Sequence, residues 1–315
     1  MTQLIRQVRP VAQSAQAMRA EPRRFSIAMA TFNGELYIRQ QLNSLAEQIL
    51  LPYELVACDD GSSDNTVSIL EEFQKEAPFP VTIHPNPSRL GFADNFLDAA
   101  SKCTADWIAF SDQDDLWHSW KLSRAIDCLE RQACECYSAN VTAFWEDGSE
   151  VLIDKSHVQR EFDYLFEGPG PGCTYVMSTR LAREIQDVLH GDAGIARDIA
   201  LHDWFTYAWA RSHRFAWFID KKPVMRYRQH VANHLGVNVG SITARRRMRQ
   251  IRSGWYRQQV EAIAKTCGVD SVTAVRNALQ KGLSGRISLA LHAGKFRRRR
   301  RDAFALALIS LLGWF

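Results

Sequence analysis

Long apolar runs, disulfide spacings and glycine-rich phosphate motifs are all missing from this 315-residue sequence. Because no run of about 20 apolar residues exists, no membrane-spanning helix is expected. The first 24 residues are basic and lack the apolar segment of a signal peptide. The seven cysteines fit no disulfide framework, and Cys128, Cys134 and Cys136 lack the spacing of a zinc site. A reducing, cytoplasmic location is therefore expected.

Two patterns that bind phosphates through backbone amides are absent, namely GxGxxG and GxxxxGK followed by Ser or Thr. A nucleotide would then need another way to hold its phosphates. A divalent cation that bridges carboxylates and phosphate oxygens is the alternative.

The charge of the chain is small in sum but uneven along its length. The net charge is +4, yet residues 221–315 hold 20 Lys and Arg against 3 Asp and Glu. Residues 1–220 hold the other 19 basic and 32 acidic residues. Such a basic tail on an acidic body predicts contact with something anionic, either nucleic acid or a membrane surface.

Strand-like apolar runs alternate with helical patterns in the first 130 residues. The expected strands are residues 25–31, 53–58, 79–84 and 106–112. A helix between the first two is indicated by Ile38, Leu42, Leu45 and Ile49. This alternation predicts an α/β fold, a Rossmann-like and mainly parallel sheet flanked by helices. Residues 137–156 suggest a meander, and basic helices are expected beyond residue 240.

Acidic residues gather where two of the expected strands end. Asp59 and Asp60 follow one strand, and "SDQDDLW" places Asp112, Asp114 and Asp115 after another. Ligands of parallel sheets bind at the carboxyl ends of the strands. Since clustered carboxylates repel one another, the cluster predicts an open Mg²⁺ or Mn²⁺ site for a diphosphate.

A resemblance to a known family rests on several segments in consistent order. They are "SIAMATFNGELYIRQQLNSLAEQ", "ELVACDDGSSDNT", "RLGFADNF", "FSDQDDLW", "GCTYVMS", "HDW" and "YRQHVANHLG". Together they resemble family-2 glycosyltransferases with the GT-A fold, in the bacterial rhamnosyltransferase-like branch. The resemblance covers residues 25–236, which leaves an N-terminal arm at 1–24 and a basic helical region at 237–315. It implies inverting transfer from a nucleotide-sugar with Mg²⁺ or Mn²⁺.

The resemblance also implies roles for individual residues. The positions that match donor-binding residues are Thr31, Phe32, Asn33, Glu35, Asp60, Asn95, Asp112 and Arg228. Asp60 would accept from a pyrimidine N3–H, and Arg228 would pair with a phosphate. Asp114 matches the main metal ligand, with Asp112 and His230 as further ligands. Asp203 matches the base that deprotonates the acceptor hydroxyl.

Other positions are assigned by the same resemblance. Gly172, Cys173 and Thr174 match an acceptor-side loop, with Cys173 as a packing residue, and Asp115 is interpreted as an acid that orients the acidic turn. His202 is either a hydrogen-bond partner or a buried structural residue. The implied donor is dTDP-L-rhamnose, with UDP-hexoses as the alternative, and the acceptor is a lipid-linked saccharide. Phe32 replaces the usual tyrosine, and "WHSWKL" lacks the usual proline.

The sequence lacks the motifs expected for three alternative classes of protein. A processive synthase would show a QxxRW-like segment and membrane spans, and a nucleotidyltransferase would show a Gly-rich loop with an arginine after the first strand. A nucleic-acid binder would interleave aromatics with the arginines of "ARRRMRQIR" and "RRRRR". No nucleic-acid partner is therefore expected.

The C-terminus joins five arginines, Arg297–Arg301, to the apolar segment Ala303–Phe315. At 13 residues this segment is too short to cross a bilayer core of about 30 Å. Arginines beside apolar and aromatic residues are typical of an interfacial anchor, which predicts a peripheral position at the inner face of the cell membrane. The alternative is a helix that packs on the body, with its arginines paired to acids.

Overall fold

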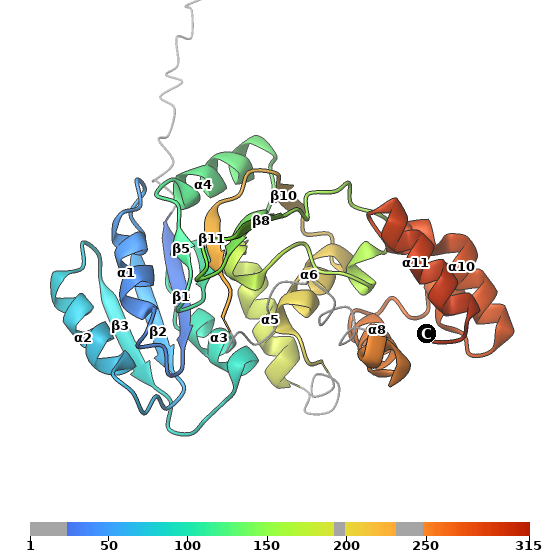
Figure 1. Ribbon diagram of the computed structural model, residues 1–315, viewed down its shortest axis with the longest axis horizontal. Helices are drawn as coiled ribbons and strands as arrows, with labels where there is room; N and C mark the ends of the chain where they lie inside the picture. The colour runs from blue at the N-terminus through green and yellow to red at the C-terminus, as the bar shows by residue number, and fades with distance from the viewer. Residues whose placement is uncertain (1–23, 192–198, 231–247) are drawn as a thin grey trace, which may run out of the picture.

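A computed structural model describes residues 24–191, 199–230 and 248–315 (Figure 1). Its centre is a seven-stranded sheet in the order β10-β6-β9-β4-β1-β2-β3. These strands are β1 (Phe25–Thr31), β2 (Glu54–Asp59), β3 (Val81–Pro85), β4 (Trp107–Ser111), β6 (Cys136–Ala139), β9 (Val176–Ser178) and β10 (Trp217–Asp220). Only β9 runs antiparallel to its neighbours within this sheet, so the predicted mainly parallel α/β fold is confirmed.

Strand β1 shows why the sheet needs cover on both faces. Phe25, Ile27 and Met29 pack into one hydrophobic cluster, and Ala28 and Ala30 pack into the other. This alternation follows from the two-residue period of a strand. Every residue of β1 is buried, as expected for a parallel strand between two helical layers.

The helices divide between the two faces of the sheet. On the face of Ile27 lie α1 (Ile38–Ala46), α2 (Thr66–Glu76) and α4 (Lys121–Arg131). On the face of Ala28 lie α3 (Phe92–Ser101), α5 (Thr179–Gly191) and α6 (His202–Ser212). Helix α1 ends at Ala46, so the prediction that Ile49 belongs to the same helix is wrong, and Ile49 is 73% exposed.

A smaller sheet, in the order β5-β11-β7-β8, lies next to the acidic turn. Its strands are β5 (Leu116–Trp117), β7 (Val141–Phe144), β8 (Glu150–Ile153) and β11 (Met225–Arg228). The expected meander over 137–156 is confirmed in part, since β7 and β8 pair antiparallel within it, whereas β6 belongs to the large sheet. Asn140 lies at the crossing, and its side chain donates to Asp154 and to the carbonyl of Lys221.

The C-terminal helices share the core of the large sheet. They are α8 (Trp255–Thr266), α9 (Thr273–Leu279), α10 (Leu283–Phe296) and α11 (Arg300–Leu311). Val260, Phe296 and Phe315 belong to the same hydrophobic cluster as Phe166 and Trp204 of the preceding region. The expected boundary at 236/237 falls outside the described residues. Within the described ranges, no helix has the length and apolarity needed to span a bilayer.

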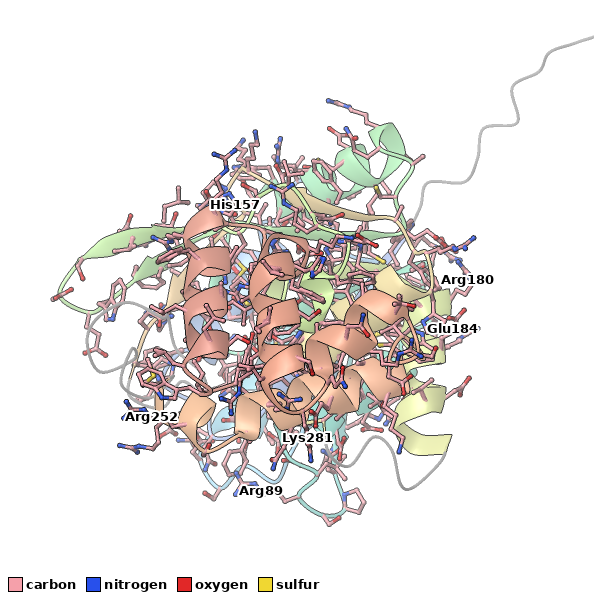
Figure 2. All side chains as sticks on the ribbon, turned by 90° about the vertical axis from the view of Figure 1, so that its right-hand side faces the viewer. Arg89, His157, Arg180, Glu184, Arg252 and Lys281 are labelled. Carbon is pink, nitrogen blue, oxygen red and sulfur yellow. The ribbon has the colours of Figure 1, made fainter. Side chains whose placement is uncertain are left out.

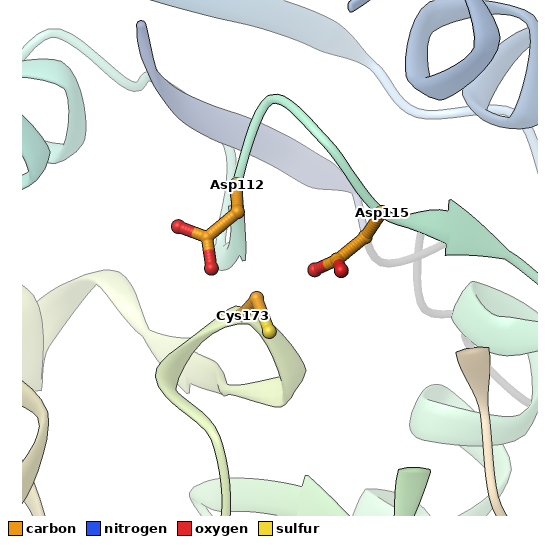
Figure 3. A group of neighbouring side chains, drawn as sticks. All are labelled: Asp112, Asp115 and Cys173. Atoms are coloured by element: carbon orange, nitrogen blue, oxygen red, sulfur yellow. The ribbon is translucent and has the colours of Figure 1, made fainter. Parts of the chain in front are cut away.

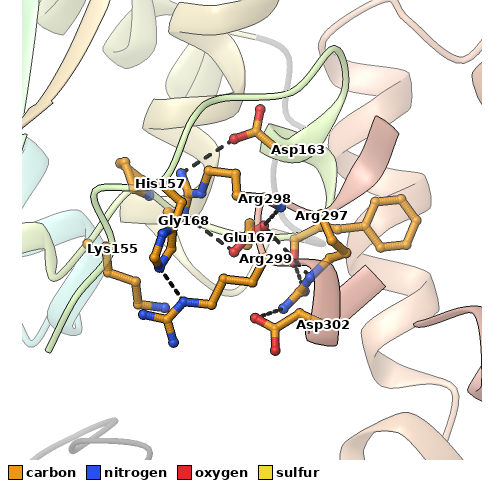
Figure 4. Close-up of polar contacts among 12 residues, drawn as sticks. Lys155, His157, Asp163, Glu167, Gly168, Arg297, Arg298, Arg299 and Asp302 are labelled. Carbon is orange, nitrogen blue, oxygen red and sulfur yellow. Dashed lines mark hydrogen bonds and ion pairs between the residues drawn. The ribbon is translucent and has the colours of Figure 1, made fainter. Parts of the chain in front are cut away.

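Helices α10 and α11 form a hairpin at the end of the molecule opposite α2 and β3 (Figure 1). The link between them carries Arg297–Arg299, whose side chains turn inward to the body (Figure 4). Their acidic partners are Asp154, Asp163, Glu167 and Asp302. Only Arg300 and Arg301 of the five are exposed, so the prediction that all five form the polar end of an anchor is wrong for the first three.

Two short 3₁₀ turns complete the frame, η1 (Asp163–Leu165) and η2 (Gly172–Thr174). Buried Arg298 holds the segment between them, because it contacts Asp163 and Glu167 and donates to the carbonyl of Gly168. A buried arginine paired with two acids fixes the position of all three groups. The hairpin is thereby tied to the segment that enters η2.

Candidate active site

The acidic turn connects β4 to β5 at the carboxyl edge of the large sheet. Asp112, Asp115 and Cys173 meet there, with one potential ligand atom of each within 4.8 Å of the others (Figure 3). Asp115 is fully buried. Its Oδ2 atom has no hydrogen-bond partner among the described residues.

Burial and mutual repulsion make full ionisation of this cluster costly. Burial, and then the charge of Asp114, raise the pKa of Asp112 to about 7. The same two causes raise the pKa of Asp115 well above its ordinary value. Burial also raises the pKa of the Cys173 thiol, which keeps the sulfur neutral and supports its interpretation as a packing residue.

The residues of the turn fit an oxygen-preferring divalent cation. Carboxylates are the ligands that Mg²⁺ and Mn²⁺ select, and the unpartnered Oδ2 of Asp115 offers a further oxygen. Asp114 and His230, which were predicted to be metal ligands, lie together, with Oδ2 and Nε2 2.7 Å apart. Asp112 lies instead beside Asp115, which sequence reasoning had treated only as an orienting residue.

Arg228, at the end of β11, fastens the acidic turn to the small sheet. Its backbone N–H donates to Asp115 at 3.0 Å, and its Nε donates to the carbonyl of Asp114 at 2.8 Å. The guanidinium also donates to Gln40 and lies 4.5 Å from the ring centre of Tyr37. Arg228 is therefore part of the wall that shapes the turn, and its predicted contact with a phosphate stays a prediction.

The predicted donor-binding residues on the other side of the turn form a second cluster at the ends of β1 and β2. Thr31 donates to Asp59 at 2.9 Å. Asn95 donates to the carbonyls of Thr31 and Cys58. Asp60 accepts from the backbone N–H groups of Leu90 and Gly91 and from Asn86. Burial alone would raise the pKa of Asp60, but these hydrogen bonds hold it below its ordinary value, so Asp60 is a carboxylate.

Asn33 and Glu35 connect the turn after β1 to the start of α2. Asn33 has a positive φ of 47°, a conformation that asparagine tolerates, and its Oδ1 accepts from Ser63. The carboxylate of Glu35 accepts from the backbone and side chain of Asn65. Both residues thus shape the loop, and their contact with a nucleotide stays a prediction.

Gln113, which the sequence reasoning passed over, joins these two clusters. Its amide accepts from the N–H of Phe32 and donates to the carbonyl of the same residue, both at 2.9 Å. The ring of Phe32 lies under the guanidinium of Arg89, 4.0 Å away. The middle residue of the DQD motif therefore fixes the distance between the acidic turn and the aromatic ring.

Asp203 lies in the first turn of α6, where its Oδ1 accepts from the N–H of Trp204 at 2.7 Å. A Cβ added to Gly172 would lie 3.1 Å from the Cβ of Asp203, so η2 packs directly on this residue. The Asp203 charge also contributes to the raised pKa of Asp112, after burial and Asp114. The structure thus brings the predicted base, the predicted acceptor-side loop and the acidic turn together. His202 is buried and stacks on Phe96.

A buried lysine beneath the cluster was not predicted. Lys121 is fully buried, donates to the carbonyl of Cys173 at 2.7 Å and lies 3.2 Å from the ring centre of Trp117. Desolvation lowers its pKa to about 7, against the charges of Asp112 and Asp115. The sequence did hold a signal, because Lys121 shares the helical spacing of the buried Ala125 and Leu129.

Comparison with known proteins identifies the class that this fold and site define. Residues 26–171 match Glycosyl transferase family 2. The chain belongs to this family and is a glycosyltransferase, which confirms the resemblance seen in the sequence. A relative from Shigella flexneri, described as dTDP-rhamnosyl transferase RfbG, is 41% identical over 291 residues, which are 91% of this chain and 100% of the relative.

Solved structures support the GT-A fold. TarS of S. aureus, in complex with UDP-GlcNAc, matches with a TM-score of 0.54 and 17% identity, over 92% of this chain and 89% of that one. The mannosyltransferase PcManGT from Pyrobaculum calidifontis, in complex with GDP-Man and Mn²⁺, matches with a TM-score of 0.53 and 15% identity, over 93% and 86% of the two chains. At this identity the likeness concerns the fold alone.

Gly34→Ala tests the link made by Gln113, because an added Cβ would lie 2.3 Å from Oε1 of Gln113. The amide must move and lose its two bonds to Phe32, so the free energy of unfolding should fall by about 1–3 kcal/mol, as measured by urea denaturation. Gly294→Ala, which meets nothing within 4 Å, is the control. In a Gln113→Ala background the Gly34→Ala change should cost little, and an equal cost in both backgrounds would contradict the link.

Proposed function

We propose that this protein transfers L-rhamnose from dTDP-L-rhamnose to a saccharide acceptor during synthesis of a bacterial cell-surface polysaccharide. The observation that carries the proposal is the 41% identity to a protein described as a dTDP-rhamnosyl transferase over all of that protein's length. The transfer proceeds with inversion at the anomeric carbon.

The nucleotide of the donor lies across the ends of β1 and β2 in this proposal. Phe32 supports the base with its ring, and Thr31, Asn33, Glu35 and Asn95 shape the pocket. Asp60 accepts from the pyrimidine N3–H, a role supported by the hydrogen bonds that keep its carboxyl ionised. A carboxylate at this point selects uracil or thymine over cytosine, whose N3 is an acceptor.

Asp114 holds the divalent cation, with Asp112, Asp115 and His230 as the other available ligands. A bound Mg²⁺ or Mn²⁺ would stabilise the negative charge of the departing diphosphate. The chain's own part is to fix the turn, through Arg228 on one side and Gln113 on the other. Lys121 lies buried below the cluster, and its protonated form would offset part of the acidic charge.

Asp203 acts as the base. Its carboxylate takes the proton of the acceptor hydroxyl while that oxygen bonds to the anomeric carbon and the bond to the diphosphate breaks. The transition state has oxocarbenium character, as in other glycosyl chemistry. Support comes from the position of Asp203 at the start of α6, against Gly172 of η2 and near the acidic turn.

A donor screen tests the sugar and the nucleotide together. Nucleotide release should be fastest with dTDP-L-rhamnose among a panel of dTDP- and UDP-sugars, and it should stop when EDTA removes the divalent cation. The alternative is a UDP-hexose donor, kept because the UDP-GlcNAc-bound TarS shares the fold. Faster release from a UDP-hexose than from dTDP-L-rhamnose would favour that alternative.

Two variants should separate donor binding from the chemical step. Asp114→Ala should abolish Mn²⁺-dependent binding of dTDP in calorimetry, because the diphosphate loses its cationic bridge. Asp203→Asn should keep donor affinity while turnover falls by about 10² to 10⁴. Asp127→Ala, an exposed acid on α4, is the control for both measurements. Unchanged dTDP affinity in the first variant, or near-normal turnover in the second, contradicts the assigned role.

The hairpin α10–α11 meets an anionic membrane surface in this proposal, where a lipid-linked acceptor at the inner face of the membrane would be found. Its exposed apolar residues are Leu283, Ile287, Leu291, Phe304, Leu308, Leu311, Leu312 and Trp314. Helical spacing puts the three on α10 on one side, and the exposed Arg300 and Arg301 border those on α11. Cations beside an apolar face favour an anionic bilayer over a neutral one.

Surface substitutions test this contact better than truncation at Gly294, since truncation would remove the buried Leu306 and Phe315 from the core. Leu291→Ser/Phe304→Ser/Leu308→Ser should abolish sedimentation with phosphatidylglycerol vesicles and leave the melting temperature nearly unchanged. Ile49→Ser/Leu51→Ser/Leu152→Ser changes three apolar residues exposed elsewhere and is the control. Equal sedimentation of both variants would count against the hairpin as the membrane contact.

A further inference from the structure

An open pocket rich in arginine lies where the hairpin joins the body. It has a volume of about 620 Å³ and is lined by His157, Val158, Arg160 and Arg298–Arg301. In Figure 2 the hairpin faces the viewer and His157 lies at one end of it. The volume is in the range of small-ligand sites, and five of the seven lining residues are arginines.

The cations of this pocket differ in how far they are already neutralised. Arg298 is buried against Asp163 and Glu167 (Figure 4). Arg299 lies near Asp154, and Arg301 lies 3.3 Å from Asp302. Arg160 and Arg300 are exposed. Neither of these two has an acidic partner within 4.0 Å among the described residues. The pocket thus holds two guanidinium groups that remain available to a ligand.

The N-terminus of α11 adds positive potential at the same place. Helix α11 begins at Arg300, and no side chain caps its first turn, although Asp302 in that turn offsets part of the positive end of the helix dipole. Burial, and then the charge of Arg299, lower the pKa of His157, against the opposing charge of Asp154. His157 therefore contributes a neutral ring to the pocket rather than a further cation.

An apolar stripe starts at the edge of the pocket. Arg300, Phe304, Leu308 and Leu311 follow one another at spacings of four, four and three on α11, so they share one side of the helix. The side chain of Phe304 is 73% exposed. A ligand with an anionic head and an apolar tail would match this sequence of charge and apolar surface.

We propose that the pocket binds the diphosphate of an amphiphile, with Arg160 and Arg300 on the phosphate oxygens and the tail along the stripe of α11. Guanidinium groups bind phosphate oxygens bidentately, and several together match the charge of a diphosphate better than that of a single carboxylate. Binding of the phosphoanion needs no assumption about the reaction. Its assignment to the lipid-linked acceptor rests on the proposed function.

Hydrogen bonds and packing contacts connect the pocket to the acceptor-side loop. Arg298, next to Arg299 in the chain, donates to the carbonyl of Gly168. The same segment continues to Gly172, which packs on Asp203. Tyr175, directly after η2, donates to the carbonyls of Gly170 and Asp203. The hydrogen bond from Arg298 to Gly168 therefore connects the pocket to the segment that carries η2, which packs on Asp203.

Calorimetry with inorganic pyrophosphate tests the phosphoanion site, with the full chain and EDTA present so that the donor site has no cation. The variant Arg160→Gln/Arg300→Gln should bind pyrophosphate about tenfold or more weakly than the unchanged protein. Arg183→Gln/Arg276→Gln removes two exposed arginines elsewhere and should bind within twofold of it. No binding by the unchanged protein, or equal weakening in both variants, overturns the site.

Measuring the affinity for farnesyl diphosphate distinguishes a lipid diphosphate from free phosphate as the ligand of the pocket. If the tail lies on α11, farnesyl diphosphate should bind more tightly than pyrophosphate, and Phe304→Ser/Leu308→Ser should remove that difference while pyrophosphate affinity stays the same. Equal affinity for the two ligands overturns the lipid assignment and assigns the pocket to free phosphate. These measurements contain no donor sugar, so a failure of the proposed rhamnosyl transfer appears only in the donor screen and is not confused with a failure of the pocket.

Discussion

The confinement of negative charge at the carboxyl end of β4 is the constraint on which the rest of the site depends. Two unit charges 4 Å apart repel by roughly 4 kcal/mol at an effective dielectric constant near 20. The protonated form of Lys121 beneath the cluster lowers this cost only in part, because burial lowers the pKa of Lys121 to about 7, and the pKa of Asp112 still rises to about 7. A turn that its own protein leaves incompletely neutralised is suited to receive a divalent cation, which explains why three acids follow a core strand.

The same constraint accounts for the second sheet. Acidic side chains that repel one another need a rigid backbone, or the turn would open toward solvent. Strand β11 supplies it by bringing Arg228 and His230 onto Asp114 and Asp115. Gln113 fastens the other side of the turn to Phe32. The small sheet and the first βα loop therefore hold the acidic turn from its two sides. The distance between the aromatic ring and the acids is fixed before any ligand binds.

Local patterns predicted β1, β2, β3 and β4 because each of these strands carries its own apolar pattern. The resemblance named Asp203 and the acidic turn, which the fold brings close together. The predictions that were wrong or incomplete concern residues whose surroundings are set by partners distant in the sequence. Arg297–Arg299 look identical to Arg300 and Arg301 in a run of five, yet acids about 130 to 145 positions away decide which are buried. Asp115 looked secondary beside Asp114, because the unpartnered oxygen that distinguishes it exists only in the folded chain. Lys121 could have been noticed from its place on an apolar helical stripe.

These contacts explain what the uneven charge of the chain does in the folded protein. The basic tail meets its first anions within the same molecule, since Asp154, Asp163 and Glu167 belong to the acidic body. Buried pairs of this kind contribute more to fixing geometry than to net stability, because desolvation offsets much of their attraction. Their effect is to hold the hairpin against the body while Arg300 and the apolar stripe of α11 stay exposed. The buried ion pairs thereby determine where the exposed positive charge of the hairpin lies.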